Sequence, residues 1–244
     1  MKLLIDAGNT RIKWALADGS EADGQTWQRS GVLPVEQAGK LSQQFAGLEG
    51  IRQVWVSNVA GEEIAQHIRA ACGSAQPRFI VAQEVQCGVR NGYSSPAQLG
   101  SDRWAALIAA WYLVRGTCLV VNSGTATTVD ALSAMGEFIG GLILPGVELM
   151  QRSLCAATAQ LQAAQAGKYA SFPLNSADAL YSGALQASCG AIERQHALLG
   201  GSSAPVVLSG GAEEVLRNRL NVPLRIVDNL VLQGLWLIAQ ETSA

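Results

Sequence analysis

Two short turns in this chain carry residue types that bind phosphate. The first, Asp6-Ala7-Gly8-Asn9-Thr10, follows an apolar run, and Lys13 comes shortly after it. Gly8 permits close backbone approach, so N–H groups can point at a phosphate, while Asn9 and Thr10 add side-chain donors. Lys13 would neutralise phosphate charge. Asp6 is a candidate Mg²⁺ ligand, because this ion prefers carboxylate and phosphate oxygens.

The second turn, Ser123-Gly124-Thr125-Ala126-Thr127-Thr128, supplies hydroxyls without bulk. It lies within LVVNSGTATTVDAL, which aligns without a gap to the earlier LLIDAGNTRIKWAL. Four positions are identical: Leu3/Leu119, Gly8/Gly124, Ala15/Ala131 and Leu16/Leu132. The copies are spaced by nearly half of the 244 residues, which predicts a duplicated domain whose two turns face a shared cleft. The alternatives are an ordinary hairpin turn for the first copy and simple β-propensity of Thr for the second.

A third candidate element, Leu99-Gly100-Ser101-Asp102-Arg103, opens a predicted helix after a loop that carries Tyr93. Asp102 is placed to accept a proton from a substrate hydroxyl, and Arg103 to clamp a carboxylate bidentately. The alternative is a helix-cap acid beside a solvated Arg.

Two glycine-containing segments, the glycine-bracketed strand 140–146 and residues 208–211 with two glycines after a strand, either let an adenine ring lie against the backbone or are simple tight turns. The sequence has neither GxxxxGK[ST] nor GxGxxG after a strand. A P-loop enzyme and a Rossmann dehydrogenase are therefore disfavoured.

Composition narrows the class further. The chain is 49% hydrophobic and 15% charged with a net charge of −2, so it can bury a core and has no basic stripe for nucleic acid. Five cysteines without a CxxC pair and two histidines argue against zinc and for reduced thiols. The N-terminus reaches Asp6 after only three apolar residues, too few for a signal-peptide core, and no apolar run is long enough to span a bilayer. We expect a cytoplasmic protein without membrane contact.

Hydrophobic patterning predicts the same opening in both halves, a strand, a turn and a second strand. Further expected strands and helices alternate after each opening, which indicates an α/β class with mixed sheets. The predicted strands are 2–5, 11–17, 53–57, 78–81, 118–121, 127–131, 137–143 and 206–208. The predicted helices are 36–48, 62–71, 102–114, 147–165, 177–199, 213–219 and 229–239, with Ser101 and Ser176 as caps. We place the domain boundary between residues 115 and 116, giving domains 1–115 and 116–244.

Taken together, DAGNTRIKW, NGYSSPAQLGSDRW, NSGTATTVDA, GGLILPG, LNSADALYSGA and LSGG resemble the type III pantothenate kinases of the acetate kinase/Hsp70/actin-like superfamily. The resemblance covers nearly the whole chain. It implies two duplicated ribonuclease H-like domains with an interdomain nucleotide cleft. It also implies ATP-dependent phosphorylation of the primary hydroxyl of pantothenate, the first step of coenzyme A synthesis, by a homodimer.

Residue roles follow from the same resemblance. Asp102 would be the general base. The ATP-binding set would be Asp6, Ala7, Gly8, Asn9, Thr10, Arg11, Ile12, Lys13 and Thr125, with Mg²⁺ at Asp6. Pantothenate would contact Tyr93, Gly100, Ser101, Asp102 and Arg103, and Ser176 would reach it across the dimer.

Two positions depart from the family pattern. Asn122 stands where an Asp usually helps bind a monovalent cation, K⁺ or NH₄⁺, and its amide oxygen lacks the charge. Ser176 stands where Thr is usual but keeps the hydroxyl. Two other functions remain open, a small-molecule kinase such as a sugar kinase and a regulatory, transcription-accessory homologue. Arg103 argues against a neutral sugar, and Asp6, Lys13 and Asp102 together favour an active enzyme.

Overall fold

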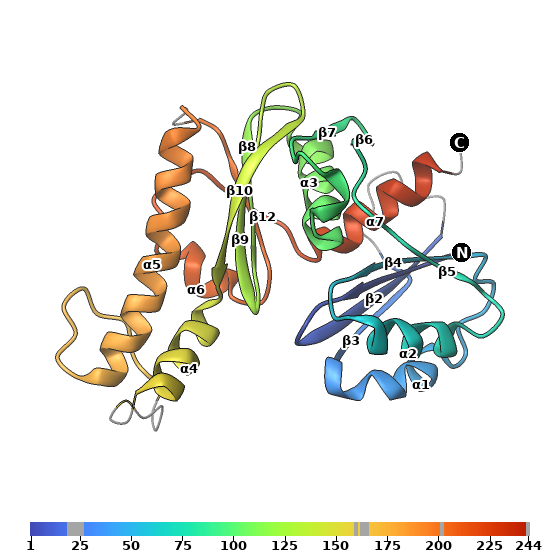
Figure 1. Cartoon of the computed structure of the whole chain (residues 1–244), viewed down its shortest axis with the longest axis horizontal. Coiled ribbons are helices and arrows are strands. Elements are labelled where there is room, and N and C mark those ends of the chain that lie inside the picture. Colours follow the sequence, from blue (N-terminus) through green and yellow to red (C-terminus); the bar gives the residue numbers. More distant parts are fainter. Residues whose placement is uncertain (19–26, 159–160, 162–165, 201–202, 243–244) are drawn as a thin grey trace. The chain divides into compact units, whose positions relative to one another are not determined.

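The computed structural model describes residues 1–18, 27–158, 161, 166–200 and 203–242, and these form two compact units (Figure 1). Unit 1 comprises Met1–Leu113, Gly136–Phe138 and Asn229–Ala244, and unit 2 comprises Val114–Met135 and Ile139–Asp228. The chain first passes from unit 1 to unit 2 between Leu113 and Val114, two residues before the predicted boundary at 115/116. The contacts also join residues 229–244 to unit 1, although the sequence boundary counted them with the second half.

Unit 1 is built on a five-stranded mixed sheet in the order β3-β2-β1-β4-β5. The β1–β2 and β2–β3 pairs are antiparallel, and β1–β4 and β4–β5 are parallel. The strands are β1 (Lys2–Ala7), β2 (Arg11–Ala17), β3 (Arg29–Pro34), β4 (Gln53–Asn58) and β5 (Pro77–Phe79).

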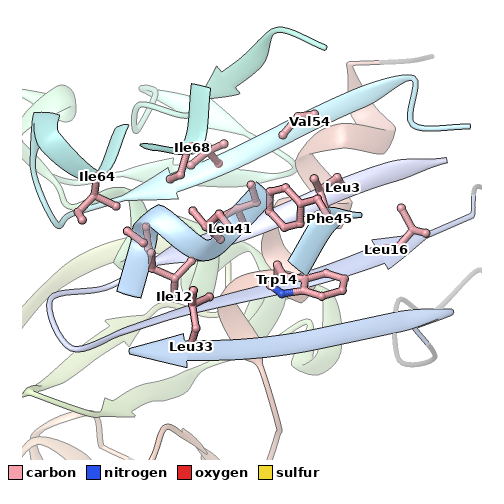
Figure 2. Packing of buried hydrophobic residues seen from close by; sticks show 14 residues of the cluster. Leu3, Ile12, Trp14, Leu16, Leu33, Leu41, Phe45, Val54, Ile64 and Ile68 are labelled. Carbon is pink, nitrogen blue, oxygen red and sulfur yellow. The ribbon is translucent and has the colours of Figure 1, made fainter. Parts of the chain in front are cut away.

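One face of this sheet is covered by η1 (Val35–Lys40), α1 (Leu41–Phe45) and α2 (Glu62–Cys72). Figure 2 shows apolar side chains of the strands packed with those of these helices. The Trp14 ring meets Phe45 edge-on, with ring centroids 5.6 Å apart. This packing fixes the strand ends from which the first turn projects.

The other face of the sheet contacts α7 (Leu230–Glu241), whose residues touch β1, β2 and β4. Gly234 lets the α7 backbone lie directly against Ala105 of α3 (Ser101–Val114), since a Cβ at this glycine would overlap the Ala105 backbone. Both helices are apolar around most of their circumference, as expected for helices buried on several sides. The apolar run at the chain end therefore completes the core of unit 1.

Unit 2 repeats this order in five strands, β12-β11-β8-β9-β10, of a seven-stranded sheet that continues through β7 (Val89–Asn91) and β6 (Val85–Gln86). Its strands are β8 (Cys118–Ser123), β9 (Ala126–Leu132), β10 (Glu137–Pro145), β11 (Val206–Ser209) and β12 (Leu224–Ile226). Its helices are α4 (Val147–Ala157), α5 (Ser176–Leu198) and α6 (Glu213–Arg217). Leu185 and Ile192 of α5 pack into one core with Leu119 and Val121 of β8.

The shared strand order confirms the predicted α/β class and duplication. The gapless alignment, however, holds only through the first strand. Ala7 pairs with Ile12 across the first turn, whereas Ser123 pairs with Thr127 across the second, so the first loop is one residue longer. Ala15/Ala131 and Leu16/Leu132 are therefore not equivalent positions, because one residue of slip reverses the face of a strand.

Several expected boundaries need correction. Strand β3 was missed because RSGVLP is rich in turn formers, yet its Gly31 is needed where the Trp14 indole leaves no room for a Cβ. The predicted helix 36–48 is instead η1 followed by α1. Of the predicted helix 147–165, α4 ends at Ala157, and residues 159–160 and 162–165 lie outside the described residues.

The two predicted serine caps are also wrong. Gly100 precedes α3, and its carbonyl accepts the Trp104 N–H at 2.9 Å, while Ser101 is already helical. Asn175 caps α5 by accepting the Asp178 N–H, so Ser176 is the first residue of that helix. No helix in the described part of the chain is both long and apolar enough to cross a membrane.

Candidate functional site

The end of β1 places Asp6 in the middle of the unit 1 sheet. Its register partners are Lys13 on β2 and Ser57 on β4. The strand itself is buried because Leu3, Leu4 and Ile5 are at most 1% exposed. A carboxylate at this position is thus carried by a rigid element, with an ammonium on the neighbouring strand.

Asp6 is the most perturbed carboxyl group of the site. Burial raises the pKa of Asp6 to about 7, the nearby Asp102 carboxylate raises it further, and Lys13 opposes both effects. Burial likewise raises the pKa of Asp102, against the lowering effect of Arg103. Two carboxylates with raised pKa values at one place indicate a functional site rather than a solvated turn.

The start of α3 holds Asp102 through its own backbone. The Asp102 carboxylate accepts the Arg103 N–H at 2.8 Å, which satisfies one of the N–H groups that a helix leaves free at its start. Gly100 leaves space for this carboxylate, since a Cβ at residue 100 would lie 2.7 Å from the Asp102 oxygen. Glycine at position 100 is therefore required by the placement of Asp102.

Arg103 is buried to 6% exposure between aromatic rings. Its guanidinium lies 5.7 Å from the centroid of the Tyr93 ring and 5.6 Å from that of Phe138, and its Nη1 donates to the Tyr93 hydroxyl at 2.9 Å. Cation–π contacts orient a guanidinium without neutralising it. A fixed, charged fork of this kind suits a carboxylate ligand.

The loop that carries Tyr93 is fixed by Asn91, the last residue of β7 (Val89–Asn91). The Asn91 side chain accepts the Tyr93 N–H at 3.0 Å and donates at 3.2 Å to the carbonyl of Pro96, the first residue of η2 (Pro96–Gln98). Phe138, at the start of β10, pairs with Asn91 in register. One amide therefore shapes the loop, and one aromatic ring supports it.

The second turn has a different character. The Ser123 and Thr127 hydroxyls lie 3.0 Å apart in the interior, so they bond to each other. Thr125 is partly exposed, and its carbonyl accepts the Gly146 N–H at 2.8 Å. Asn122 lies opposite Thr128 on one side and Ser209 on the other. The turn thus presents hydroxyl and amide groups.

The structure brings most of the predicted unit 1 residues together. Asp6, Lys13 and Asp102 interact electrostatically, and Tyr93 contacts Arg103. Ala7 and Ile12 are fully buried, so only their backbone is available to a ligand, whereas Asn9, Thr10 and Arg11 are exposed. Ser176, in unit 2, is exposed at the start of α5 and borders a hollow of about 510 Å³ with residues of α4 and α5.

Sequence reasoning missed three residues that support the site: Ser57, Asn91 and Phe138. Ser57 ends a buried apolar strand, as Asp6 does, and that shared pattern was a usable signal. Asn91 opens the motif NGYSSPAQLGSDRW but was assigned no role of its own. Phe138 had no signal, because its role depends on a strand pairing that the sequence does not reveal.

Comparison with known proteins decides the family. The family model described as type III pantothenate kinase matches residues 2–197. The chain belongs to the type III pantothenate kinase family. The member from Aromatoleum aromaticum is 51% identical over 100% of this chain and 100% of its own length. The member from Nitrosospira multiformis is 49% identical over 99% of this chain and 92% of its own length.

Solved structures agree on the fold. A Campylobacter jejuni protein described as a Baf family transcriptional activator has a TM-score of 0.61 at 21% identity, covering 99% of this chain and 98% of its own. A Sinorhizobium meliloti protein described as a 2-dehydro-3-deoxygalactonokinase has a TM-score of 0.60 at 15% identity, covering 99% of each chain. The chain therefore shares its overall fold with these two proteins.

Asp6 and the residues around it can be compared with the ligands that Mg²⁺ prefers. Burial, together with the Asp102 carboxylate, raises the pKa of Asp6, and a divalent cation bound at this carboxylate would oppose both effects. Among the described residues, no three His, Cys, Asp or Glu side chains cluster as a complete metal site. Mg²⁺ usually takes one or two carboxylates and completes its shell with phosphate oxygens and water. The residues present fit an ion that arrives with a nucleotide.

Proposed function

We propose that this chain transfers the γ-phosphoryl group of ATP to the primary hydroxyl of pantothenate, giving 4'-phosphopantothenate, the first step of coenzyme A synthesis. The observation that carries the proposal is the adjacency of Asp102 and Arg103, an acid of raised pKa beside a buried, ring-oriented guanidinium. Pantothenate carries a carboxylate and a hydroxyl, so it matches both groups. Membership of the family supports the same substrate.

In this proposal Asp102 is the general base. As the hydroxyl oxygen attacks the γ-phosphorus, its proton passes to the Asp102 carboxylate, and the bond to the β-phosphate oxygen breaks to release ADP. A raised pKa brings the base nearer to working pH, where proton transfer is most effective. Phosphoryl transfer otherwise depends on positioning and charge neutralisation rather than on covalent help.

The first turn is assigned to the phosphates. Exposed Asn9, Thr10 and Arg11 offer donors, Gly8 leaves the backbone accessible, and Lys13 supplies positive charge. Thr125 of unit 2 is proposed to contact the same nucleotide. Asp6 would hold Mg²⁺, which neutralises phosphate charge when bound. Arg103 would bind the pantothenate carboxylate, with Tyr93, Gly100 and Ser101 around it.

Asp102→Asn tests the general-base role. The amide keeps the size and one acceptor oxygen but takes up no proton, so we expect kcat to fall by about 10²–10⁴. Turnover is followed by a coupled ADP-release assay with pantothenate, and folding by the melting temperature. Glu49→Gln, an exposed acid of the same unit, is the matched control. A near-normal kcat for Asp102→Asn would overturn the assignment.

The same assay tests the substrate. Pantothenate should be preferred over neutral sugars, and Arg103→Met should weaken pantothenate by raising its KM more than it changes the KM of ATP. Absence of pantothenate-dependent ADP release by the unmodified chain would reject the kinase proposal in favour of a regulatory homologue. A sugar giving faster turnover would indicate a different small-molecule kinase.

Whether a monovalent cation activates the enzyme depends in this proposal on Asn122. An amide oxygen ligates K⁺ or NH₄⁺ without a full charge, so we expect the unmodified enzyme to respond weakly when Na⁺ is replaced by K⁺ or NH₄⁺. Asn122→Asp should raise that response by several-fold, because a carboxylate binds the cation more strongly. Turnover measured in each chloride salt decides. Equal salt responses of the two proteins would exclude residue 122 from a cation site.

We further propose a homodimer in which Ser176 of one subunit reaches the pantothenate of the other. Unit 2 exposes large apolar side chains that a partner would cover, namely Ile139, Ile143, Leu154, Phe172 and Leu174. Light scattering after size exclusion gives the mass directly. A monomer at working concentration would contradict this part of the proposal.

A further inference from the structure

Two buried hydroxyls connect β4 to the start of α3. The Ser57 Oγ lies 2.9 Å from the Ser101 Oγ, and either group can donate. Ser57 is 0% exposed and Ser101 9% exposed. Both residues belong to unit 1, so this contact lies within one compact unit.

The position of this pair relative to the carboxylates gives it significance. Ser57 is the register partner of Asp6 across the parallel β4–β1 pair, so both side chains stand on the same face of the sheet. Ser101 directly precedes Asp102. The hydroxyl pair therefore joins the strand neighbour of one carboxylate to the chain neighbour of the other.

When both are ionised, the Asp6 and Asp102 carboxylates repel each other, so a bond between the strand and the helix start restrains their separation. Asp102 contributes to the electrostatic environment of Asp6, and both groups are shielded from water. Repulsion between like charges favours movement of the α3 start away from the strand. The Arg103 N–H bond holds the Asp102 carboxylate against its own helix and makes no link to the sheet. The Ser57–Ser101 bond does make that link.

We propose that Ser57 is a positioning residue for the phosphoryl transfer, holding Asp102 through Ser101 at a fixed place relative to Asp6. The inference rests on the proposed function, in which Asp102 accepts the substrate proton. Ser57 itself touches no reacting atom. Its removal changes where the base stands rather than what the base is.

The test compares Ser57→Ala with Ser188→Ala. Ser188 is equally buried, and its hydroxyl bonds to the Ala184 carbonyl within α5 at 3.0 Å, so it controls for the general effect of deleting an interior hydroxyl. We expect Ser57→Ala to lower kcat about 10–100-fold with both KM values within about two-fold, because small misplacements of reacting groups strongly slow reactions. Ser188→Ala should keep kcat within about two-fold.

Two further variants separate positioning from general damage. Ser57→Thr keeps the hydroxyl and should recover most of kcat even if its added methyl group lowers the melting temperature. Ser57→Ala made on top of Ser101→Ala should change kcat by less than about two-fold, since the link is already broken. An unchanged kcat in Ser57→Ala, or no recovery in a folded Ser57→Thr, would overturn the proposal.

A measurement that needs no turnover keeps this inference distinct from the proposed function. Amide hydrogen exchange over residues 101–104 should be at least about ten-fold faster in Ser57→Ala than in the unmodified chain or in Ser188→Ala. Unchanged exchange would overturn the link, whatever the assay shows. A lack of turnover by the unmodified chain would instead reject the kinase function. In that case hydrogen exchange could still show that Ser57 holds the start of α3, but this link would have no role in catalysis.

Discussion

The two hairpin turns have closely similar backbone anchors and very different side chains. In the first, the Val59 and Val35 N–H groups bond to the carbonyls of Ala7 and Thr10, each at 3.0 Å. In the second, the Ala212 and Gly146 N–H groups bond to the carbonyls of Ser123 and Thr125, at 3.0 and 2.8 Å. Duplication has thus preserved how each turn is held by its neighbouring loops.

The side chains at equivalent positions have diverged. Asp6 pairs in register with Lys13, and at the corresponding place Asn122 pairs with Thr128. One copy therefore carries a carboxylate and an ammonium, and the other an amide and a hydroxyl. The comparison teaches that a shared backbone arrangement can carry unlike chemistry, with charge concentrated in the turn of unit 1.

The largest expected effect comes from removing the carboxylate of the first turn. Asp6→Asn gives the first turn the amide of the second, and we expect kcat/KM to fall about 10²–10³-fold through lost charge at the phosphates. Asn122→Ala is the matched change in the second turn and should lower kcat/KM less than about ten-fold. The coupled ADP-release assay at saturating Mg²⁺ measures both. Similar losses for the two variants would mean that the turns contribute equally.

Much of this comparison was accessible from the sequence, because local signals and global fold agree there. Apolar runs ending in Gly and polar residues predicted β1, β2, β8 and β9 and the duplication itself. The same reasoning grouped the unit 1 candidates Asp6, Lys13 and Asp102, which the structure brings together.

What the sequence could not predict depends on distant contacts. The first loop is one residue longer than the second, but the four identical positions favour an alignment without a gap, and such an alignment cannot show the extra residue. Strand β3 is specified by its pairing with β2 rather than by its own propensity. The sequence also does not show that α7 packs on the sheet of unit 1, because an apolar helix can pack on any apolar face.

The next effect concerns how tightly each turn is enclosed. Gly210 has φ +106, and a Cβ there would overlap the Ser123 backbone, whereas a Cβ at Gly8 would lie 3.4 Å from the Arg11 carbonyl. We expect Gly210→Ala to lower the free energy of unfolding by roughly 2–4 kcal/mol and Gly8→Ala by less than about 1 kcal/mol. Urea unfolding followed by circular dichroism measures both. Equal losses would contradict the stronger enclosure of the second turn.

The smallest expected effect is on the pH dependence of the melting temperature, measured on the protein without ligands. The folded-state pKa of Asp6 is raised to about 7, so between roughly pH 4 and pH 7 the folded chain keeps a proton that the unfolded chain has lost. The folded state is favoured while Asp6 stays protonated, and this contribution is lost as the pH rises through about 7. Asp6→Asn has no proton to lose. We therefore expect its melting temperature to exceed that of the unmodified chain at pH 8, by an amount on the order of a few degrees, and by less at pH 5.

Asn122→Ala, which removes no charge, should give a difference in melting temperature that is the same at both pH values. Calorimetric scans of the three proteins without Mg²⁺ or ATP provide the comparison. A pH-independent difference for Asp6→Asn would show that the Asp6 carboxylate is not destabilised by its surroundings. A difference that disappears on adding Mg²⁺ and ATP would instead identify the missing counter-charge, because ligands that bind only the folded state stabilise it. Stability without ligand and activity would then change in opposite directions at Asp6, as expected where a protein maintains an uncompensated charge for its chemistry.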